Sequence, residues 1–173
     1  MINSCTISKI EKSDLTTLVN LVNSAYRGES SKKGWTTEAD LLGGIRTSLK
    51  SVQELLQQPG AIILTAKNEN NQLVGCVYLQ EQRNQLYLGM LTVAPDIQAK
   101  GIGNQLLLAA EKYAAEINCN TITMTVIDVR HELIDWYKRK GYKNTGETKP
   151  FPSDPSFGIP KQPLQFVVLE KKI

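Results

Sequence analysis

Residues 86–117 follow a pattern that predicts an apolar strand, then a turn with two glycines, then an amphipathic helix. The strand ends at Val93, and Gly101 and Gly103 lie just before or at the start of the helix. Glycine lets the backbone approach a ligand closely, and the first N–H groups of a helix have no partner within the helix. The segment therefore predicts a binding site for an anion such as a pyrophosphate. Taken alone, so short a glycine pattern is more often a structural turn than a ligand site.

The rest of the chain predicts a mixed α/β (α+β) fold with helices on both faces of a mostly antiparallel sheet. Periodicity and turn residues predict further helices at residues 15–26, 51–58 and 130–140, and strands at 61–67, 73–81, 121–127, 142–147 and 164–170. The strand at 121–127 follows the central helix, so we expect it to run parallel to the strand ending at Val93. Residues 27–34 are expected to form a loop, and residues 36–42 the start of a helix.

Composition narrows the possible functions. A chain of 173 residues is the length of one domain. Its net charge of +3 is far below that of a typical nucleic-acid-binding protein, which carries a strongly basic stripe. No apolar run approaches the about 18 residues that would predict a membrane span. Residues 1–9 contain no long apolar run, so no signal peptide is expected. Cys5, Cys76 and Cys119 form no CxxC pair and His131 is the single histidine, which predicts reduced thiols in a cytoplasmic protein without a metal site.

Two other nucleotide-binding motifs are excluded by the same turn. A dinucleotide-binding GxGxxG motif would need a third glycine where this chain has Leu106. A Walker loop would need the sequence GK[ST] after the glycines, which is absent.

Two longer motifs carry more information than the glycines. The first is Leu91-Thr92-Val93-Ala94-Pro95 followed by Gln98-Ala99-Lys100-Gly101-Ile102-Gly103 and a leucine-rich helix. The second is the helix end Leu133-Ile134-Asp135-Trp136-Tyr137-Lys138-Arg139-Lys140-Gly141-Tyr142. Together, and in this order of elements, they resemble the acetyl-CoA motifs of the GNAT family of N-acetyltransferases, and the resemblance covers nearly the whole chain.

The resemblance implies a single N-acetyltransferase domain over residues 1–173, with the acyl-CoA N-acyltransferase fold, in which two central parallel strands splay apart around the acetyl-CoA. It implies transfer of the acetyl group of acetyl-CoA to a primary amine, by direct attack on the thioester. The positions that match the family's cofactor contacts are Leu91, Thr92, Val93, Gln98, Ala99, Lys100, Gly101, Ile102, Gly103, Asn104 and Arg130. Arg130 stands where the family often has Asn, so it would instead reach a phosphate or a substrate carboxylate, or simply begin a helix.

Tyr137 matches the family's general acid, which serves the departing thiolate. A phenol with a pKa of about 10 donates to a thiolate of pKa about 8.5 only with help from the site, so hydrogen-bond donation is its expected role. The amine must also lose a proton, and several relatives place a carboxylate on the third meander strand, where this chain has none. Candidates for the missing base are Glu81, Glu29 and Glu38, and a water chain to bulk solvent is the alternative.

The acceptor site is implied to include Tyr26, Glu29, Trp35 and Glu38. The acceptor is expected to be a small-molecule amine or a peptide amine, without nucleic-acid or membrane partners. The last strand, around residues 166–169, is a candidate for pairing two copies into a homodimer. The alternative function is a catalytically silent acetyl-CoA sensor or regulatory module, which the missing strand carboxylate favours and Tyr137 opposes.

Overall fold

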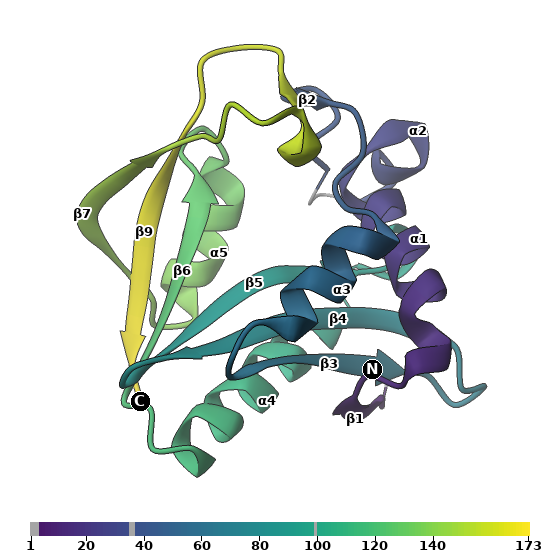
Figure 1. Ribbon diagram of the computed structural model, residues 1–173, viewed down its shortest axis with the longest axis vertical. Helices are drawn as coiled ribbons and strands as arrows, with labels where there is room; N and C mark the ends of the chain where they lie inside the picture. Colours follow the sequence, from purple (N-terminus) through teal and green to yellow (C-terminus); the bar gives the residue numbers. More distant parts are fainter. Residues whose placement is uncertain (1–3, 35–36, 99) are drawn as a thin grey trace.

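The computed structural model describes residues 4–34, 37–98 and 100–173 (Figure 1). Its elements are β1 Thr6–Lys9, η1 Lys12–Asp14, α1 Leu15–Tyr26, α2 Gly28–Ser31, β2 Leu42–Gly43, α3 Leu49–Gln57, β3 Ala61–Lys67, β4 Leu73–Gln82, β5 Gln85–Val93, η2 Pro95–Ile97, α4 Ile102–Glu116, β6 Thr121–Ile127, α5 His131–Arg139, β7 Lys143–Pro150, η3 Pro155–Phe157, β8 Ile159–Pro160 and β9 Gln165–Lys172. None of the helices in these ranges is long and apolar enough to cross a membrane.

A seven-stranded sheet organises the fold, in the order β1-β3-β4-β5-β6-β9-β7. Its neighbours are antiparallel except for β5 and β6, which run parallel, as the helix between them predicts. These two strands pair only where residues 85–87 of β5 face residues 121–123 of β6. Beyond that point they diverge, and Figure 1 shows them as an open V. The predicted mixed fold with a splayed parallel pair is confirmed.

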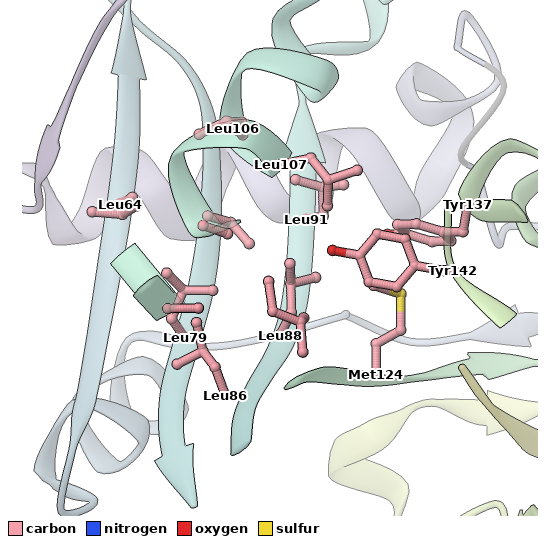
Figure 2. Packing of buried hydrophobic residues seen from close by; sticks show 14 of the residues in the cluster. Leu64, Leu79, Leu86, Leu88, Leu91, Leu106, Leu107, Met124, Tyr137 and Tyr142 are labelled. Atoms are coloured by element: carbon pink, nitrogen blue, oxygen red, sulfur yellow. The ribbon is translucent and has the colours of Figure 1, made fainter. Parts of the chain in front are cut away.

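Helices cover both faces of the sheet because the β4 side chains alternate between them. Cys76 and Tyr78 pack against Leu18 and Val22 of α1, whereas Val77 packs in the cluster that contains α4. Figure 2 shows part of this second cluster, which also holds Leu106, Leu107, Met124, Tyr137 and Tyr142. The two helix layers thus fix α1 and α4 on opposite sides of the strand that carries the first motif.

A bulge interrupts β5 next to the point where it leaves β6. Gly89 faces Tyr78 and Thr92 faces Cys76, so Met90 and Leu91 oppose one residue of β4. Met90 has a φ of +53°, and its carbonyl accepts hydrogen bonds from the Thr92 hydroxyl (2.9 Å) and the Cys76 thiol (3.8 Å). In the registers described for β4 and β6, neither Met90 nor Leu91 has a ladder partner. The bulge therefore leaves the Leu91 N–H without a ladder partner and available to a ligand.

Several short elements differ from the sequence-based expectations. The segment expected as a loop contains α2, and the helix start expected at 36–42 is wrong, because residues 39–41 form a turn that leads into β2. β2 pairs with β8, and the Lys161 N–H donates to the Leu41 carbonyl at 2.8 Å. β9 lies between β6 and β7, so both of its edges are occupied and it cannot pair two copies in a dimer. The edge strands of this sheet are β1 and β7.

Candidate active site

Two cavities meet where β5 diverges from β6. One has a volume of about 580 Å³ and lies against the start of α4 and one side of α5. The other has a volume of about 300 Å³ and lies between α1, the divergent strands and residues 151–152. Both are lined by the same four side chains, Tyr26, Leu91, Leu133 and Tyr137. A molecule in either cavity therefore reaches Leu91 and Tyr137.

The larger cavity ends at the N-terminus of α4. Gly101 precedes the helix with a φ of +84°, a left-handed conformation that a residue with a Cβ rarely adopts. Its carbonyl accepts the N–H of Gln105 at 3.0 Å, so the N–H groups of residues 102–104 lie before the first intrahelical hydrogen bond. Gly101, Gly103 and Asn104 line the cavity. This geometry gives the anion site that the turn predicts.

The side of α5 supplies cations to the same cavity. Arg139 and Lys140 line it together with Trp136, and the Lys140 ammonium lies 5.7 Å from the centre of the Trp136 ring. Basic residues at the end of a helix are also typical of a solvent-exposed surface, where they interact with the helix dipole. The sequence alone therefore does not assign Arg139 and Lys140 to a ligand site. Glu132 and Asp135 line the same cavity, so the two cations and two carboxylates of the lining balance, and the attraction for an anion comes mainly from the N–H groups at the start of α4.

The predicted cofactor contacts are distributed unevenly. Leu91, Val93, Gln98, Gly101, Ile102, Gly103 and Asn104 all line the larger cavity. Thr92 is buried and supports the bulge, Lys100 is exposed and is not among the lining residues, and Ala99 lies outside the described residues. Arg130 lines the smaller cavity. The Gln98 side chain donates to the Val93 carbonyl at 3.0 Å, which ties the turn to the end of β5.

Tyr137 is 5% exposed and faces the junction of the two cavities. Burial raises its pKa well above the usual value, the neighbouring Tyr26 raises it further, and the charge of Arg130 partly opposes this. The phenol is therefore neutral at physiological pH and keeps its proton, which it can donate to a hydrogen bond. Its ring packs edge-to-face on Trp136 and Tyr142, at 5.1 and 5.8 Å between ring centres, which holds it in place.

Tyr26 closes the junction from the opposite side. Its hydroxyl donates a hydrogen bond to the Leu91 carbonyl and so connects the end of α1 to the bulge. Burial raises the pKa of Tyr26, and the charges of Arg46 and Arg130 lower it. Tyr26 therefore positions the bulge rather than serving as a base.

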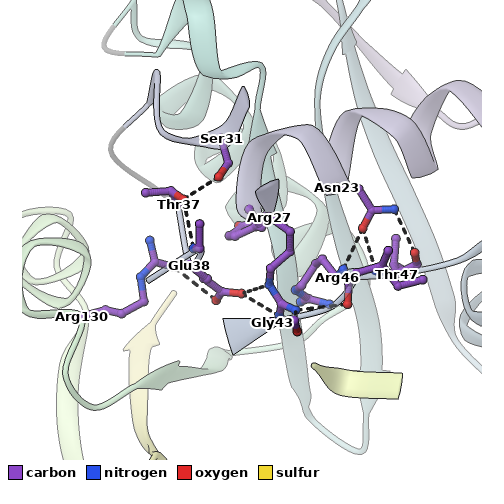
Figure 3. A network of polar contacts seen from close by, with 12 residues as sticks. Asn23, Arg27, Ser31, Thr37, Glu38, Gly43, Arg46, Thr47 and Arg130 are labelled. Atoms are coloured by element: carbon purple, nitrogen blue, oxygen red, sulfur yellow. Dashed lines mark hydrogen bonds and ion pairs between the residues drawn. The ribbon is translucent and has the colours of Figure 1, made fainter. Parts of the chain in front are cut away.

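A buried ion-pair network forms the wall of the smaller cavity (Figure 3). One Glu38 oxygen accepts from Nε and Nη2 of Arg27, at 3.2 and 3.0 Å, and the other lies 3.4 Å from Nη1 of Arg130. Arg27 also donates to the Gly43 and Ile45 carbonyls at 3.4 and 3.1 Å. Glu38 thus holds together α1, the segment before β2 and the start of α5, because its carboxylate is bound on both oxygens.

The remaining candidates for the base and the acceptor site lie in different places, and some lie outside the described residues. Glu81 is exposed near the β4–β5 hairpin and lines neither of the two cavities, so the structure does not bring it to the junction. Its charge acts instead on Tyr113 and Cys119. The side chain of Glu29 and the whole of Trp35 lie outside the described residues. Arg46, which sequence reasoning missed, lines the smaller cavity.

A model of the acetyltransferase (GNAT) family matches residues 16–142. The chain belongs to this family. The match includes Tyr26 of α1, the bulge strand and α5, which supply the four residues that both cavities share. The family expectation from the two motifs is therefore confirmed. A search among curated protein sequences found no match.

Solved structures share the GNAT fold with this chain at low sequence identity. The ribosomal-protein-S18-alanine N-acetyltransferase from Escherichia coli superposes with a TM-score of 0.72 at 15% identity, over 98% of this chain and 94% of that one. The PaiA N-acetyltransferase from Thermoplasma acidophilum, solved in complex with coenzyme A, gives 0.69 at 21% identity, over 98% and 99%. The ribosomal-protein-alanine N-acetyltransferase from Brucella melitensis gives 0.71 at 20% identity, over 97% and 99%. These matches show a common GNAT fold over nearly the full length of each chain.

Proposed function

We propose that the protein transfers the acetyl group of acetyl-CoA to a primary amine. The observation that carries this proposal is the meeting of two cavities at Leu91 and Tyr137. One cavity ends at the N–H groups of the α4 N-terminus, which suit an anionic ligand, and the other is closed by a buried network of charged side chains. An acyl group held by the first ligand would meet an acceptor in the second cavity at the junction.

The residues of the larger cavity fit acetyl-CoA. The N–H groups at the start of α4 would bind its pyrophosphate, and Arg139 and Lys140 would offset the phosphate charges. The backbone of Leu91 and Val93, next to the splayed gap, would pair with the pantetheine arm. A volume of about 580 Å³ lies within the usual range for cofactor sites. When bound, acetyl-CoA supplies an activated thioester.

The roles of the chain's own groups follow from this placement. The Leu91 N–H at the bulge would donate to the thioester oxygen as negative charge develops there. The amine nitrogen forms a bond to the carbonyl carbon, the carbon–sulfur bond breaks, and the sulfur leaves as a thiolate. Tyr137 would donate a hydrogen bond to this sulfur, while the proton lost by the amine ends on the thiolate through solvent. The products are an N-acetylated amine and coenzyme A with a free thiol.

Calorimetric titration of acetyl-CoA into the purified protein tests this function, with NAD as the control ligand. We expect acetyl-CoA to bind with a Kd in the micromolar range, about −8 kcal/mol, and NAD not to bind. Amine-dependent release of coenzyme A thiol would then establish turnover. An absence of acetyl-CoA binding would overturn the proposal, and binding without turnover of any amine would favour the sensor function.

Gly103→Ala is expected to weaken acetyl-CoA binding without destabilising the fold. A Cβ at Gly103 would contact Trp136 and Val93 at 3.7 Å, an ordinary distance, so the chain itself tolerates the methyl group. Because Gly103 is the second residue of α4 and not in its middle, alanine there should leave the stability of the fold unchanged or raise it by less than about 1 kcal/mol. The same methyl group would intrude on the cavity, and overpacking of about 1–3 kcal/mol predicts a roughly 5- to 150-fold weaker acetyl-CoA affinity.

Gly101→Ala serves as the comparison for Gly103→Ala, because its main expected effect is on the stability of the fold. Because Gly101 has a φ of +84°, alanine there should destabilise the fold by about 1–2 kcal/mol. Calorimetry and thermal denaturation of both variants measure the two quantities. Unchanged acetyl-CoA affinity of the Gly103→Ala protein would show that the ligand does not approach the start of α4.

A further inference from the structure

The smaller cavity has a positive charge excess. Among the described lining residues, the charged side chains are Arg27, Arg46, Arg130 and Glu38, so three cations face one carboxylate and leave a net charge of +2. Glu38 is already bound on both oxygens by Arg27 and Arg130. A ligand that enters this cavity therefore meets more cationic than anionic groups, in surroundings where charges are poorly screened.

Half of this excess is the charge of Arg46, which is the one cation of the three that does not bind Glu38. Its side chain is half-buried, and its guanidinium lies 5.6 Å from the centre of the Tyr26 ring. Within the described ranges, its guanidinium has no carboxylate partner and no hydrogen bond, although its backbone N–H donates to Asn23 at 2.8 Å. A partly buried guanidinium with five donors is suited to a planar anion that accepts two hydrogen bonds.

The position of Arg46 also fixes where the rest of a ligand would lie. Tyr26 is in contact with Arg46 through its ring and with the Leu91 carbonyl through its hydroxyl. A small molecule whose anionic end lies at Arg46 would therefore extend past Tyr26 toward the bulge. The cavity volume of about 300 Å³ suits a molecule of this size.

We propose that the acceptor is a small amine that also carries a carboxylate, such as a free amino acid, with the carboxylate bound at Arg46. This inference rests on the proposed acetyl transfer. The amine would lie at the junction, between Leu91 and Tyr137, where its nitrogen attacks the thioester carbon as described above. The positive surroundings also lower the pKa of the bound amine, which favours the neutral, nucleophilic form without a carboxylate base. Polyamines, which carry several positive charges, are disfavoured by the same field.

Matched acceptor pairs test the carboxylate. Coenzyme A thiol release is measured with free L-amino acids and with their C-terminal amides, with spermidine and with an alanine-initiated peptide. We expect at least one free amino acid to be acetylated with a kcat/KM about 10-fold or more above that of its amide, since charge-assisted hydrogen bonds discriminate by this amount. Equal or better turnover of the amide, of spermidine or of the peptide would overturn the proposal.

Arg46→Gln tests the residue. We expect it to lower kcat/KM for the free amino acid about 10- to 100-fold, mainly through KM, and to change the value for the amide by less than about 3-fold. Arg46→Lys should restore part of the loss. Arg83→Gln, the same change at an exposed hairpin residue outside both cavities, serves as the control and should act as wild type. An equal loss for both members of the pair would assign Arg46 a structural role and overturn the proposal.

Acetyl-CoA calorimetry on the wild-type protein and on each variant distinguishes a failure of the proposed function from a failure of the inference about the carboxylate. If acetyl-CoA fails to bind the wild-type protein, the proposed function itself is wrong. If acetyl-CoA binds and no free amino acid is acetylated, the inference about the carboxylate is wrong while the cofactor assignment stands.

Discussion

Replacing Tyr137 with Phe is expected to lower kcat about 100-fold while the affinity for acetyl-CoA stays unchanged. The substitution removes one hydroxyl at the junction of the two cavities and keeps the ring, whose edge-to-face contacts hold it against Trp136 and Tyr142. Because burial raises the pKa of Tyr137 well above 10, its ionisation should cause no change of kcat below that pH. Steady-state kinetics across pH, together with calorimetry, measure these effects.

Tyr142→Phe is the matched control for this change. Tyr142 is also buried and lies 5.8 Å from Tyr137, but it is not among the residues that line either cavity. Its hydroxyl has no hydrogen-bond partner in the described part of the chain, so its removal should leave stability unchanged or raise it. Kinetic loss of equal size in both variants would mean that Tyr137 acts through packing and not through its hydroxyl.

Replacing Glu38 with Ala is expected to destabilise the fold by about 3–5 kcal/mol, as is usual when one partner of a buried ion pair is removed. The change leaves Arg27, Arg46 and Arg130 facing one cavity without the carboxylate that lies between two of them. At about 2–4 °C per kcal/mol, this corresponds to a melting temperature about 6–20 °C lower. Thermal denaturation measures the shift.

Glu54→Ala supplies the exposed comparison. The Glu54 carboxylate lies 3.9 Å from the Lys50 ammonium, and both side chains are largely in solvent. Its loss should cost no more than about 0.5 kcal/mol. A Glu38→Ala protein that melts like wild type but has lost all activity would instead identify Glu38 as the general base and would contradict its structural role.

The strands and long helices could be predicted because each carries a pattern of its own. β3 and β6 have the predicted bounds, since residues 61–67 are a largely apolar run and residues 121–127 are rich in β-branched residues. β2 and β8 have two residues each and are strands only because they lie side by side in the fold. A segment that short has no periodicity, so the sequence around residue 42 suggests a helix start that does not form.

The cofactor side of the candidate site could be predicted better than the acceptor side for a related reason. The glycine turn and the start of α4 are contiguous in sequence, and so they form a recognisable motif. Arg46, Tyr26 and Arg130 come from three separate segments, and only the packing of α1 against the sheet brings them together. The sequence correctly predicts Glu81 at the end of the strand before the bulge strand, but only the fold shows that this end is the hairpin end, away from the junction.

Two kinds of structure line the smaller cavity: the central strands form one wall, here called the floor, and the loop that begins at Phe151 forms the opposite wall. The floor belongs to the central strands, whereas Phe151 and Pro152 begin a segment that returns through β8, where two residue pairs and Lys161 hold it to the chain around Leu41. Such a connection opens at a lower free energy than the sheet beneath it. Exchange of residues 151–163 is therefore expected to change which acceptor is admitted, provided that the new segment keeps Gly158, which packs against the Arg27 guanidinium, while the cavity proposed for the acyl donor stays as it is.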